Sequence, residues 1–478
     1  MRRPRTQMAR LLFLPLMLPL VLLFAAHPVQ AAVSSTLGIN YGQLGKDLPS
    51  PSRAVQLIRS VRAARVKLYD ANPAILSALV GTPLQASVML PNQLIPDAAA
   101  NQSFADHWVA SNLLPFRSSV HIRFLLVGNE ILSDYSVRNS TWPHLVTAME
   151  RLRRSLKTHS LRRVKVGTTL AMDALGTSFP PSAGAFRPDV AQSVMAPMLR
   201  FLRRSRSFYF VDVYPYLAWA ANPDAIALDY ALMEQGAKTY TDPASGLLYT
   251  NLLEQQLDAV YAAMTRLGFR DVPLVIAETG WPNGGDYDQI GANVYNAAIY
   301  NRNLARRLAA KPPIGTPARP FTVIPTFVFA LFNEDQKPGP GTERHWGLFH
   351  PNGTAVYGVD LAGRTPDAAF APLPAPTNNE PYRGKIWCVA AAGKEANVTD
   401  LGAAVAYACG QVPGACGAIK PGGKCYRADS AVWHASYAFN AYWQQFRRTG
   451  GTCFFNGLAA QTIQDPSVGS CKFPSLAS

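Results

Sequence analysis

Short apolar segments alternate with helical patterns along residues 33–360, and this alternation limits the possible folds more than any other feature. Helical spacing of apolar residues occurs between the segments, for example over Ser52–Ala63, Pro143–Thr158, Leu252–Leu267 and Ala292–Ala310. Eight segments resemble buried strands: Leu37–Tyr41, Arg65–Tyr69, Ala86–Leu90, Ile122–Val127, Val164–Thr169, Phe208–Tyr214, Leu274–Ala277 and Phe327–Leu331. Eight strands that alternate with helices predict an α/β fold, a closed (β/α)8 TIM barrel. A doubly wound open sheet is the alternative, but Gly38–Gly42 lacks the glycine spacing of its phosphate loop.

Residues 1–32 have the features of a secretory signal peptide. Four arginines among the first ten residues precede the apolar stretch Leu11–Ala26, and small residues follow at Ala31 and Ala32. The stretch contains two prolines and is short for a helix that spans a bilayer, although an uncleaved signal anchor is the alternative. We therefore expect a secreted, extracellular protein with no membrane association after signal removal. The C-terminal residues form no apolar tail, so we expect no lipid anchor.

The cysteines divide the rest of the chain. All six lie after residue 387, where a small secreted module needs disulfides that a large barrel does not. No CxxC pair is present, so a zinc site is a poor interpretation; three disulfides are expected, and six cysteines allow 15 pairings. Prolines between residues 366 and 381 predict an extended, semi-rigid linker. We predict a signal peptide (1–32), a catalytic barrel (33–364), a linker (365–384) and a disulfide-rich, mainly helical module (385–478).

The composition excludes some classes of protein. With 48% hydrophobic and 16% charged residues, the chain is not intrinsically disordered. The net charge of +15 comes from scattered basic residues without a long run, so we expect no nucleic-acid partner. Weak, salt-sensitive adsorption to acidic wall polymers is the expectation that remains. We expect a monomer that needs neither a metal nor another cofactor.

Two carboxylates follow strands four and seven directly. Glu130 comes after Asn129 at the end of strand four, and Glu278 comes after Ala277 at the end of strand seven. Catalytic groups of a TIM barrel lie where strands end and βα loops begin, so both belong to the same mouth. Each alone could be a helix cap or part of a buried ion pair. Two facing carboxylates without a metal cluster indicate glycoside hydrolysis, with Glu130 as acid/base and Glu278 as nucleophile; the sequence does not give their separation, which distinguishes retention from inversion.

Aromatic residues follow the same strand ends. They could offer flat surfaces to sugar rings, although ordinary packing is the alternative for each one. The candidates are Tyr41, Tyr69, Tyr214, Tyr216, Trp281 and Phe332.

These residues resemble glycoside hydrolase family 17, the plant endo-β-1,3-glucanases, over roughly residues 36 to 360. Seven stretches match in order: Gly38–Gly42, Val66–Asp70, Val127–Glu130, Tyr214–Tyr216, Glu278–Pro282, Phe332–Glu334 and Glu343–Phe349. The resemblance implies a TIM barrel, a retaining reaction, and the acid/base and nucleophile positions for Glu130 and Glu278.

The same resemblance implies supporting residues around the pair. Glu334, Lys337 and Glu343 would form a charged network, in which Lys337 near the nucleophile favours its ionised form. Two departures from the family pattern are Asp212 and Asp335, which stand where asparagine is usual. We expect an extra negative charge there to shift the pH optimum.

The C-terminal module resembles a family 43 carbohydrate-binding module, which binds β-1,3-glucan. The matching stretches are Trp387–Ala390, Tyr407–Gly410, His434–Asn440 and Pro466–Cys471. The resemblance implies the disulfides Cys388–Cys453, Cys409–Cys416 and Cys425–Cys471. Candidate glucan contacts are Tyr437, Phe439, Tyr442 and Trp443, which cannot all face one side of a helix, so some must be core. We expect His434 to be structural.

Together these observations predict a secreted, retaining endo-hydrolase of β-1,3-glucan of the callose or laminarin type, held on its polymer by the module. A β-1,3-glucanosyltransferase would use the same residues. A catalytically silent wall-glucan-binding protein is the second alternative, and the intact Glu130 and Glu278 speak against it.

Overall fold

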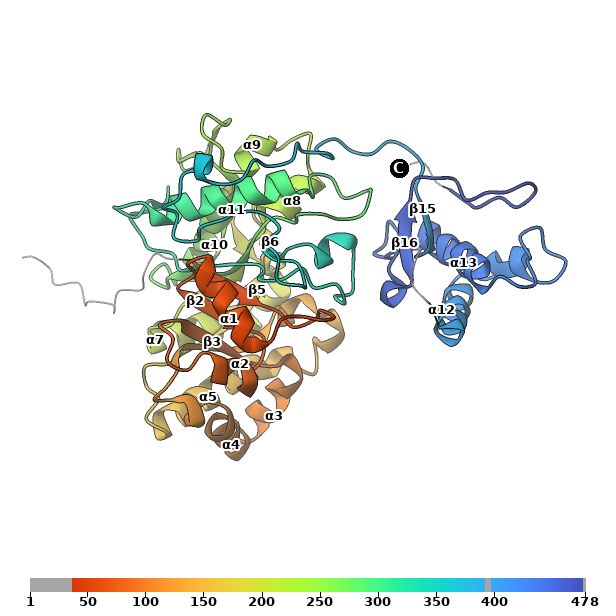
Figure 1. The fold of residues 1–478 in the computed structure, drawn as a ribbon. Coiled ribbons are helices and arrows are strands. Elements are labelled where there is room, and N and C mark those ends of the chain that lie inside the picture. The colour runs from red at the N-terminus through yellow and green to blue at the C-terminus, as the bar shows by residue number, and fades with distance from the viewer. Residues whose placement is uncertain (1–36, 392–396, 476–478) are drawn as a thin grey trace, which may run out of the picture. The chain divides into compact units, whose positions relative to one another are not determined.

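Eight parallel strands form a closed barrel in the computed structural model, which describes residues 37–391 and 397–475 (Figure 1). The predicted signal peptide lies outside the described residues. The strands follow one another round the barrel in the order β1-β14-β11-β8-β5-β4-β3-β2, and each neighbouring pair is parallel. The predicted TIM barrel is confirmed, and each of the eight expected segments overlaps one strand. The strands are β1 (Gly38–Tyr41), β2 (Arg65–Leu68), β3 (Gln85–Leu90), β4 (His121–Asn129), β5 (Lys165–Ala171), β8 (Tyr209–Asp212), β11 (Leu274–Thr279) and β14 (Thr326–Val328).

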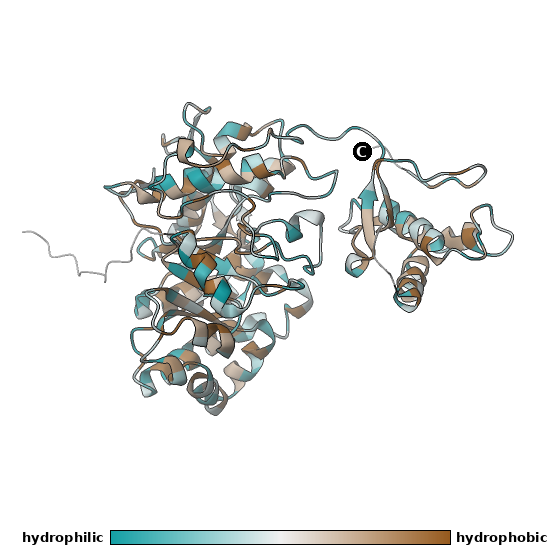
Figure 2. Cartoon of the chain, in the orientation of Figure 1, coloured by the Kyte–Doolittle hydropathy of each residue, from teal (hydrophilic) through white to brown (hydrophobic). Residues whose placement is uncertain are grey.

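Helices surround the barrel strands (Figure 1). They are α1 (Pro51–Ser60), α2 (Pro73–Ala78), α3 (Ile95–Ala100), α4 (Gln102–Asn112), α5 (Leu145–Thr158), α6 (Pro188–Val190), α7 (Ala196–Ser205), α8 (Pro215–Ala221), α9 (Leu228–Ala231), α10 (Leu252–Arg266) and α11 (Val294–Ala309). Single helices carry both polar and apolar residues (Figure 2), because one face packs on the strands. Asparagine side chains begin the two longest: Asn251 accepts from the backbone N–H of Glu254, and Asn293 from that of Asn296. None of the described helices is long and apolar enough to cross a membrane.

Three small antiparallel pairs of strands lie in the connecting segments. Each joins two-residue or three-residue strands and lies outside the barrel sheet. They are β6 (Leu175–Thr177) with β7 (Ala185–Phe186), β9 (Tyr240–Thr241) with β10 (Leu248–Tyr249), and β12 (Gly315–Thr316) with β13 (Arg319–Pro320).

Aromatic side chains fill part of the barrel interior. The rings of Phe124 on β4 and Phe210 on β8 are 5.1 Å apart although β5 lies between these strands, so they meet across the interior. On β5 itself, a Cβ at Gly167 would lie 2.2 Å from the Phe210 ring, so only glycine leaves room for it. This packing makes the interior a core, and leaves the carboxyl ends of the strands for polar side chains.

The C-terminal module has its own small core. Strands β15 (Trp387–Ala390) and β16 (Ala459–Thr462) pair antiparallel, and helices α12 (Val398–Gln411) and α13 (Ala431–Phe446) complete the module. Trp387, Phe439 and Trp443 are buried in it. The disulfides join Cys388 to Cys453, Cys409 to Cys416, and Cys425 to Cys471, which is the pairing that the sequence resemblance implies.

Part of the predicted linker, residues 365–384, is bound to the barrel by polar contacts. Asp367 accepts a hydrogen bond from Arg306 at 2.6 Å. Further along, the Asn378 amide donates to the carbonyl of Gln289 at 2.9 Å, and Asn379 Oδ1 accepts from Asn296 at 2.7 Å. The segment is therefore attached to the barrel at residue 367 and again at residues 378 and 379.

Candidate active site

A tight backbone turn positions Glu130 at the end of β4. Glu130 has φ 49° and ψ 32°, which is the left-handed region that few non-glycine residues adopt. The preceding strand end is held by Asn92, whose side chain accepts from the Asn129 N–H at 2.7 Å and donates to the Asn129 carbonyl at 2.9 Å. The Glu130 N–H donates to the Thr169 carbonyl at 3.0 Å. Such conformational strain is typical of functional sites.

Three side chains hold the carboxylate of Glu278 at the end of β11. Its Oε1 accepts from the Lys67 ammonium and from the Tyr69 hydroxyl, both at 2.6 Å. Its Oε2 accepts from the Tyr214 hydroxyl at 2.7 Å. The Lys67 side chain is completely inaccessible to solvent. Residues from the ends of two strands, β2 and β8, therefore fix this carboxylate in one orientation.

The two glutamates have opposite pKa shifts. Burial raises the pKa of Glu130 to about 7, and the negative charge of Glu278 adds to this effect. Burial also opposes ionisation of Glu278, but the Lys67 charge and the three hydrogen bonds outweigh it and hold the pKa of Glu278 below its ordinary value. One carboxyl can therefore carry a proton while the other is an anion, which is the division that an acid/base and a nucleophile require.

Asp212 lies at the end of β8, where it pairs in register with Glu278, and it is 1% exposed. The neighbouring Thr169 hydroxyl donates to Asn129 Oδ1 at 2.7 Å, and neither Asp212 oxygen has a hydrogen-bond partner within the described residues. Burial, followed by the Glu278 charge, raises the pKa of Asp212 well above its usual range. Burial therefore disfavours the extra negative charge that was expected at this position. Asp335 is exposed and accepts from the backbone N–H of Lys46 at 2.7 Å.

The charges of Glu343, Glu278 and Glu334 all act on Lys337, and a second lysine contacts the nucleophile directly. Lys337 pairs with Glu343 at 2.7 Å, whereas the ammonium in direct contact with Glu278 belongs to Lys67. Glu334 is buried and accepts from the backbone N–H of Leu44 at 2.8 Å. The sequence analysis assigned Lys67 no role, although a lysine inside the buried strand β2 signals a buried anion nearby.

The aromatic candidates separate into two groups. Tyr69 and Tyr214 contact Glu278, as described above. The other four are at most 3% exposed, and ordinary packing accounts for them: Tyr41, Tyr216, Trp281 and Phe332. Trp281, for example, packs against Tyr216 and donates its indole N–H to the Gly291 carbonyl. These four side chains can support the site but offer no flat surface to a sugar.

The same end of the barrel has a hollow of about 520 Å³ that the sequence did not predict. Phe179, Asn222 and Tyr240 line it, from the segments that follow β5 and β8. Phe179 is 61% exposed, and its ring lies 5.1 Å from that of Tyr240. This hollow offers an aromatic surface on the βα loops.

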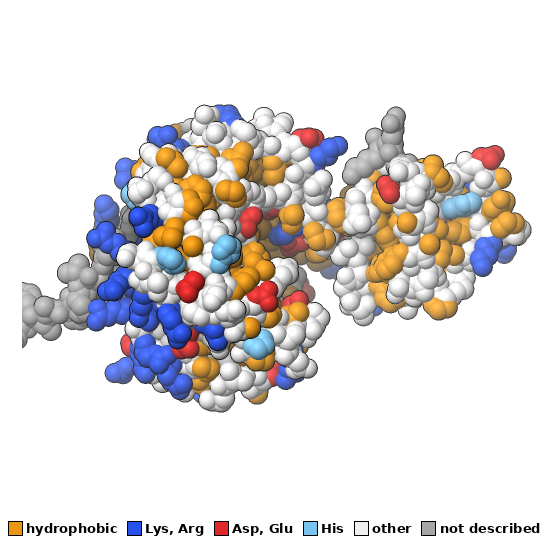
Figure 3. Space-filling model, turned by 90° about the horizontal axis from the view of Figure 1, so that it is seen from below, with side chains coloured by type: hydrophobic (Ala, Val, Ile, Leu, Met, Phe, Trp, Pro, Cys, Tyr) orange, Lys and Arg blue, Asp and Glu red, His pale blue; other side chains and the backbone are white. Residues whose placement is uncertain are grey.

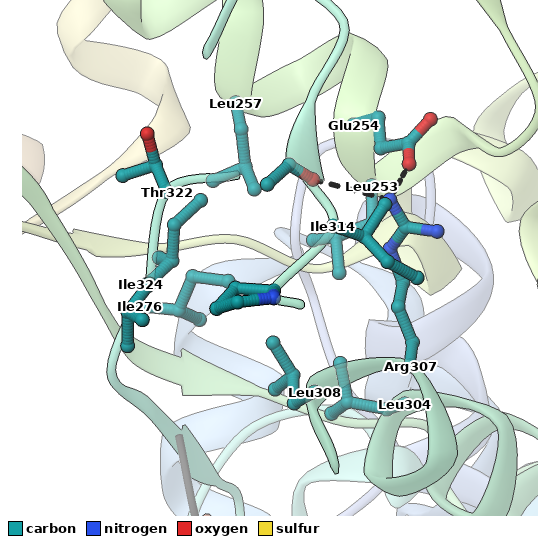
Figure 4. Close-up of a pocket in the computed structure, with 13 residues that line it drawn as sticks. Leu253, Glu254, Leu257, Ile276, Leu304, Arg307, Leu308, Ile314, Thr322 and Ile324 are labelled. Carbon is teal, nitrogen blue, oxygen red and sulfur yellow. Dashed lines mark hydrogen bonds and ion pairs between the residues drawn. The ribbon is translucent and has the colours of Figure 1, made fainter. Parts of the chain in front are cut away.

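A second, much smaller hollow of about 30 Å³ lies between α10 and the segment after α11 (Figure 4). It is lined mainly by leucine and isoleucine side chains, and Glu254 forms an ion pair with Arg307 at its edge. This mainly apolar lining is typical of structural packing between the outer elements of the barrel.

In the module, the four candidate aromatic residues are not equivalent. Phe439 and Trp443 are core residues, whereas Tyr437 and Tyr442 are only partly buried. Tyr407, which is 54% exposed, lies 5.7 Å from Tyr442 between ring centres. The ring nitrogen Nε2 of His434 accepts from the backbone N–H of Arg427 at 3.2 Å, in agreement with a structural role.

Comparison with known proteins agrees with this architecture. Residues 37–361 match the family model of glycosyl hydrolases family 17, and residues 386–460 match that of the X8 domain. The chain is 51% identical over 444 residues to the probable glucan endo-1,3-beta-glucosidase A6 of Arabidopsis thaliana, covering 93% of this chain and 92% of the relative. It is 39% identical over 476 residues to a glucan endo-1,3-beta-glucosidase of Triticum aestivum, covering 97% of this chain and all of the relative.

Solved structures resemble the barrel. CJP38, a beta-1,3-glucanase and allergen of Cryptomeria japonica pollen, has 36% identity and a TM-score of 0.64, covering 68% of this chain and 99% of that chain. A structure from a study of two plant beta-glucan endohydrolases has 37% identity and a TM-score of 0.61, covering 68% and 100%.

Proposed function

The chain belongs to glycosyl hydrolases family 17, and we propose that it hydrolyses internal β-1,3 bonds of glucan with retention of configuration. The observation that carries the proposal is the pair of carboxyls with opposite pKa shifts, Glu130 after β4 and Glu278 at the end of β11. The relatives' names support the substrate class.

In the proposed reaction, protonated Glu130 donates its proton to the leaving glycosidic oxygen. The Glu278 carboxylate attacks the sugar carbon and forms a glycosyl ester. Lys67 and the two tyrosine hydroxyls hold this carboxylate ionised and oriented. A water molecule, deprotonated by Glu130, then attacks the same carbon, so that two inversions give net retention.

The hollow at Phe179 and Tyr240 supports binding of a chain longer than one sugar. It lies on βα loops, as the two glutamates do, and aromatic rings pack well against sugar faces. We expect Phe179→Ala to weaken hydrolysis of long glucans more than that of short oligosaccharides, which kinetics on a series of chain lengths would measure. An equal loss on all lengths would contradict a binding role.

The module is proposed to hold the enzyme on insoluble glucan through the exposed Tyr407 and the partly buried Tyr442 beside it. Tethering raises the local substrate concentration without new catalytic contacts. Tyr407→Ala should weaken sedimentation with insoluble β-1,3-glucan and leave hydrolysis of a soluble oligosaccharide unchanged. Tyr426→Ala, at another exposed tyrosine of the module, is the matched control. Loss of binding in Tyr426→Ala alone would contradict the proposed contact and would place the glucan site near Tyr426.

The N-terminal sequence supports secretion, with the enzyme acting outside the cell on wall glucan. A transferase remains the second candidate, because a sugar could replace water as the attacking group at the same residues. Sizing the products from one defined oligosaccharide separates the two: longer products would favour transfer.

Chemical rescue tests the assigned roles. Glu278→Ala should lose turnover, and azide should then restore release of an inverted glycosyl azide. Glu130→Ala should be rescued with retained configuration on a substrate whose leaving group needs no proton. The exposed linker change Glu380→Gln is the control for a lost carboxylate and should leave activity unchanged. Rescue with the opposite stereochemistry, or full activity of Glu278→Ala, would refute the roles.

A further inference from the structure

Basic side chains converge at the end of the barrel opposite the catalytic glutamates. In Figure 3, Lys and Arg gather over one side of the molecule with few acidic side chains among them. The residues come from the last turns of α5, the connection from α5 to β5, the starts of β4 and β5, and the position after α7. We call this set the basic face: Arg123, Arg153, Lys157, Arg162, Lys165 and Arg206.

These charges surround a hollow and lack counter-ions. Arg153, Lys157, Arg162 and Lys165 line a hollow of about 360 Å³. No ion pair of the described residues includes a member of the basic face; the nearby acids Glu150 and Asp271 pair with other arginines. Burial lowers the pKa of Lys165, and the charges of Arg123, Arg153 and Arg206 lower it further, which indicates that like charges are crowded here.

Helix ends explain only part of this arrangement. A cation in the last turn of a helix interacts favourably with the helix dipole, which accounts for Lys157. Arg123 and Lys165, however, lie on strands, and Arg162 lies in the connection between α5 and β5. An anion in the hollow would relieve the repulsion among them.

We propose that the basic face binds an acidic polysaccharide whose carboxylates come from uronic acid residues. Guanidinium groups match carboxylates in a two-pronged geometry, and several spaced cations suit a polymer with one charge per sugar. The predicted signal peptide directs the chain out of the cell, which favours an extracellular polysaccharide over nucleic acid. Because the face lies at the amino ends of the strands, bound polymer leaves the catalytic end free.

The test uses the full chain and polygalacturonate as the probe. The variant Lys157→Gln, Arg162→Gln, Arg206→Asn removes three exposed charges; asparagine suits position 206, where φ is 52°. The control Arg53→Gln, Arg59→Gln, Lys311→Gln removes the same charge from exposed positions elsewhere. Arg53 and Arg59 lie on α1, which connects β1 to β2, and these two strands lie across the barrel from β5 and β8.

We expect the basic-face variant to bind polygalacturonate about tenfold more weakly in low salt, with a smaller salt dependence, and the control to change by less than about twofold. Both variants should hydrolyse soluble glucan at the original rate, so failure of this proposal is distinguishable from failure of the proposed function. Equal weakening in both variants would show a net-charge effect and overturn the proposal. Equally tight binding of DNA at matched salt would overturn the assignment to polyuronate.

Discussion

Glu130 should destabilise the folded protein at neutral and alkaline pH. Its pKa rises from 4.5 to about 7 on folding, mainly through burial. The folded state therefore holds a proton that the unfolded state has lost between these two values, and the stability contributed by this group falls as pH rises through that window. The shift in pKa corresponds to a destabilisation of about 3 kcal/mol, which is fully present above pH ~7 and absent below pH ~4.

Glu130→Gln replaces the carboxyl by a neutral amide of the same shape and removes this pH dependence. Urea-induced unfolding of the full chain should give equal stabilities for the two proteins near pH ~4, and a variant more stable by about 3 kcal/mol near pH ~8. Glu380→Gln, on the exposed linker, should show no such difference. A stability gain independent of pH, or a loss that grows with pH, would refute the reasoning.

Three further changes test the surroundings of Glu278. Lys67→Met leaves a buried carboxylate unpaired, so the free energy of unfolding, measured in urea, should fall by about 3–5 kcal/mol. The acid limb of the kcat/KM profile should move to higher pH. Adding Glu278→Gln should restore much of the lost stability. Asp212→Asn should keep kcat/KM within about threefold at neutral pH, because burial raises the pKa of this carboxyl and disfavours the charge that asparagine lacks; a hundredfold loss would contradict this. Gly42→Ala would place a Cβ 2.2 Å from a carboxylate oxygen of Glu334, so we expect lower thermal stability, measured by calorimetry, and unchanged stability would contradict the contact.

The fold could be predicted from sequence because its signals are local. Each strand of the barrel is an apolar segment between helical patterns, and the strand ends at Glu130 and Glu278 follow from where those segments stop. Parallel strands then bring both residues to one end of the barrel without any further information.

The parts that could not be predicted depend on contacts between distant residues. Lys67 and Glu278 are 211 positions apart, and only the closed ring of strands brings them together. The raised pKa of Asp212 depends on burial, which its place after an apolar strand does not reveal. Likewise Trp281 follows Glu278 closely in sequence, yet its ring turns into the core.

The fully enclosed Lys67 ammonium has a consequence for the covalent stage of the proposed reaction. Once Glu278 is esterified to the sugar, its negative charge disappears and no longer offsets the positive charge of Lys67. The surroundings of Glu130 therefore become more positive. The proton affinity of Glu130 then drops, because the charge that most favoured its protonation is gone. The same side chain can thus give up a proton in one half of the cycle and accept one in the other, at a single external pH.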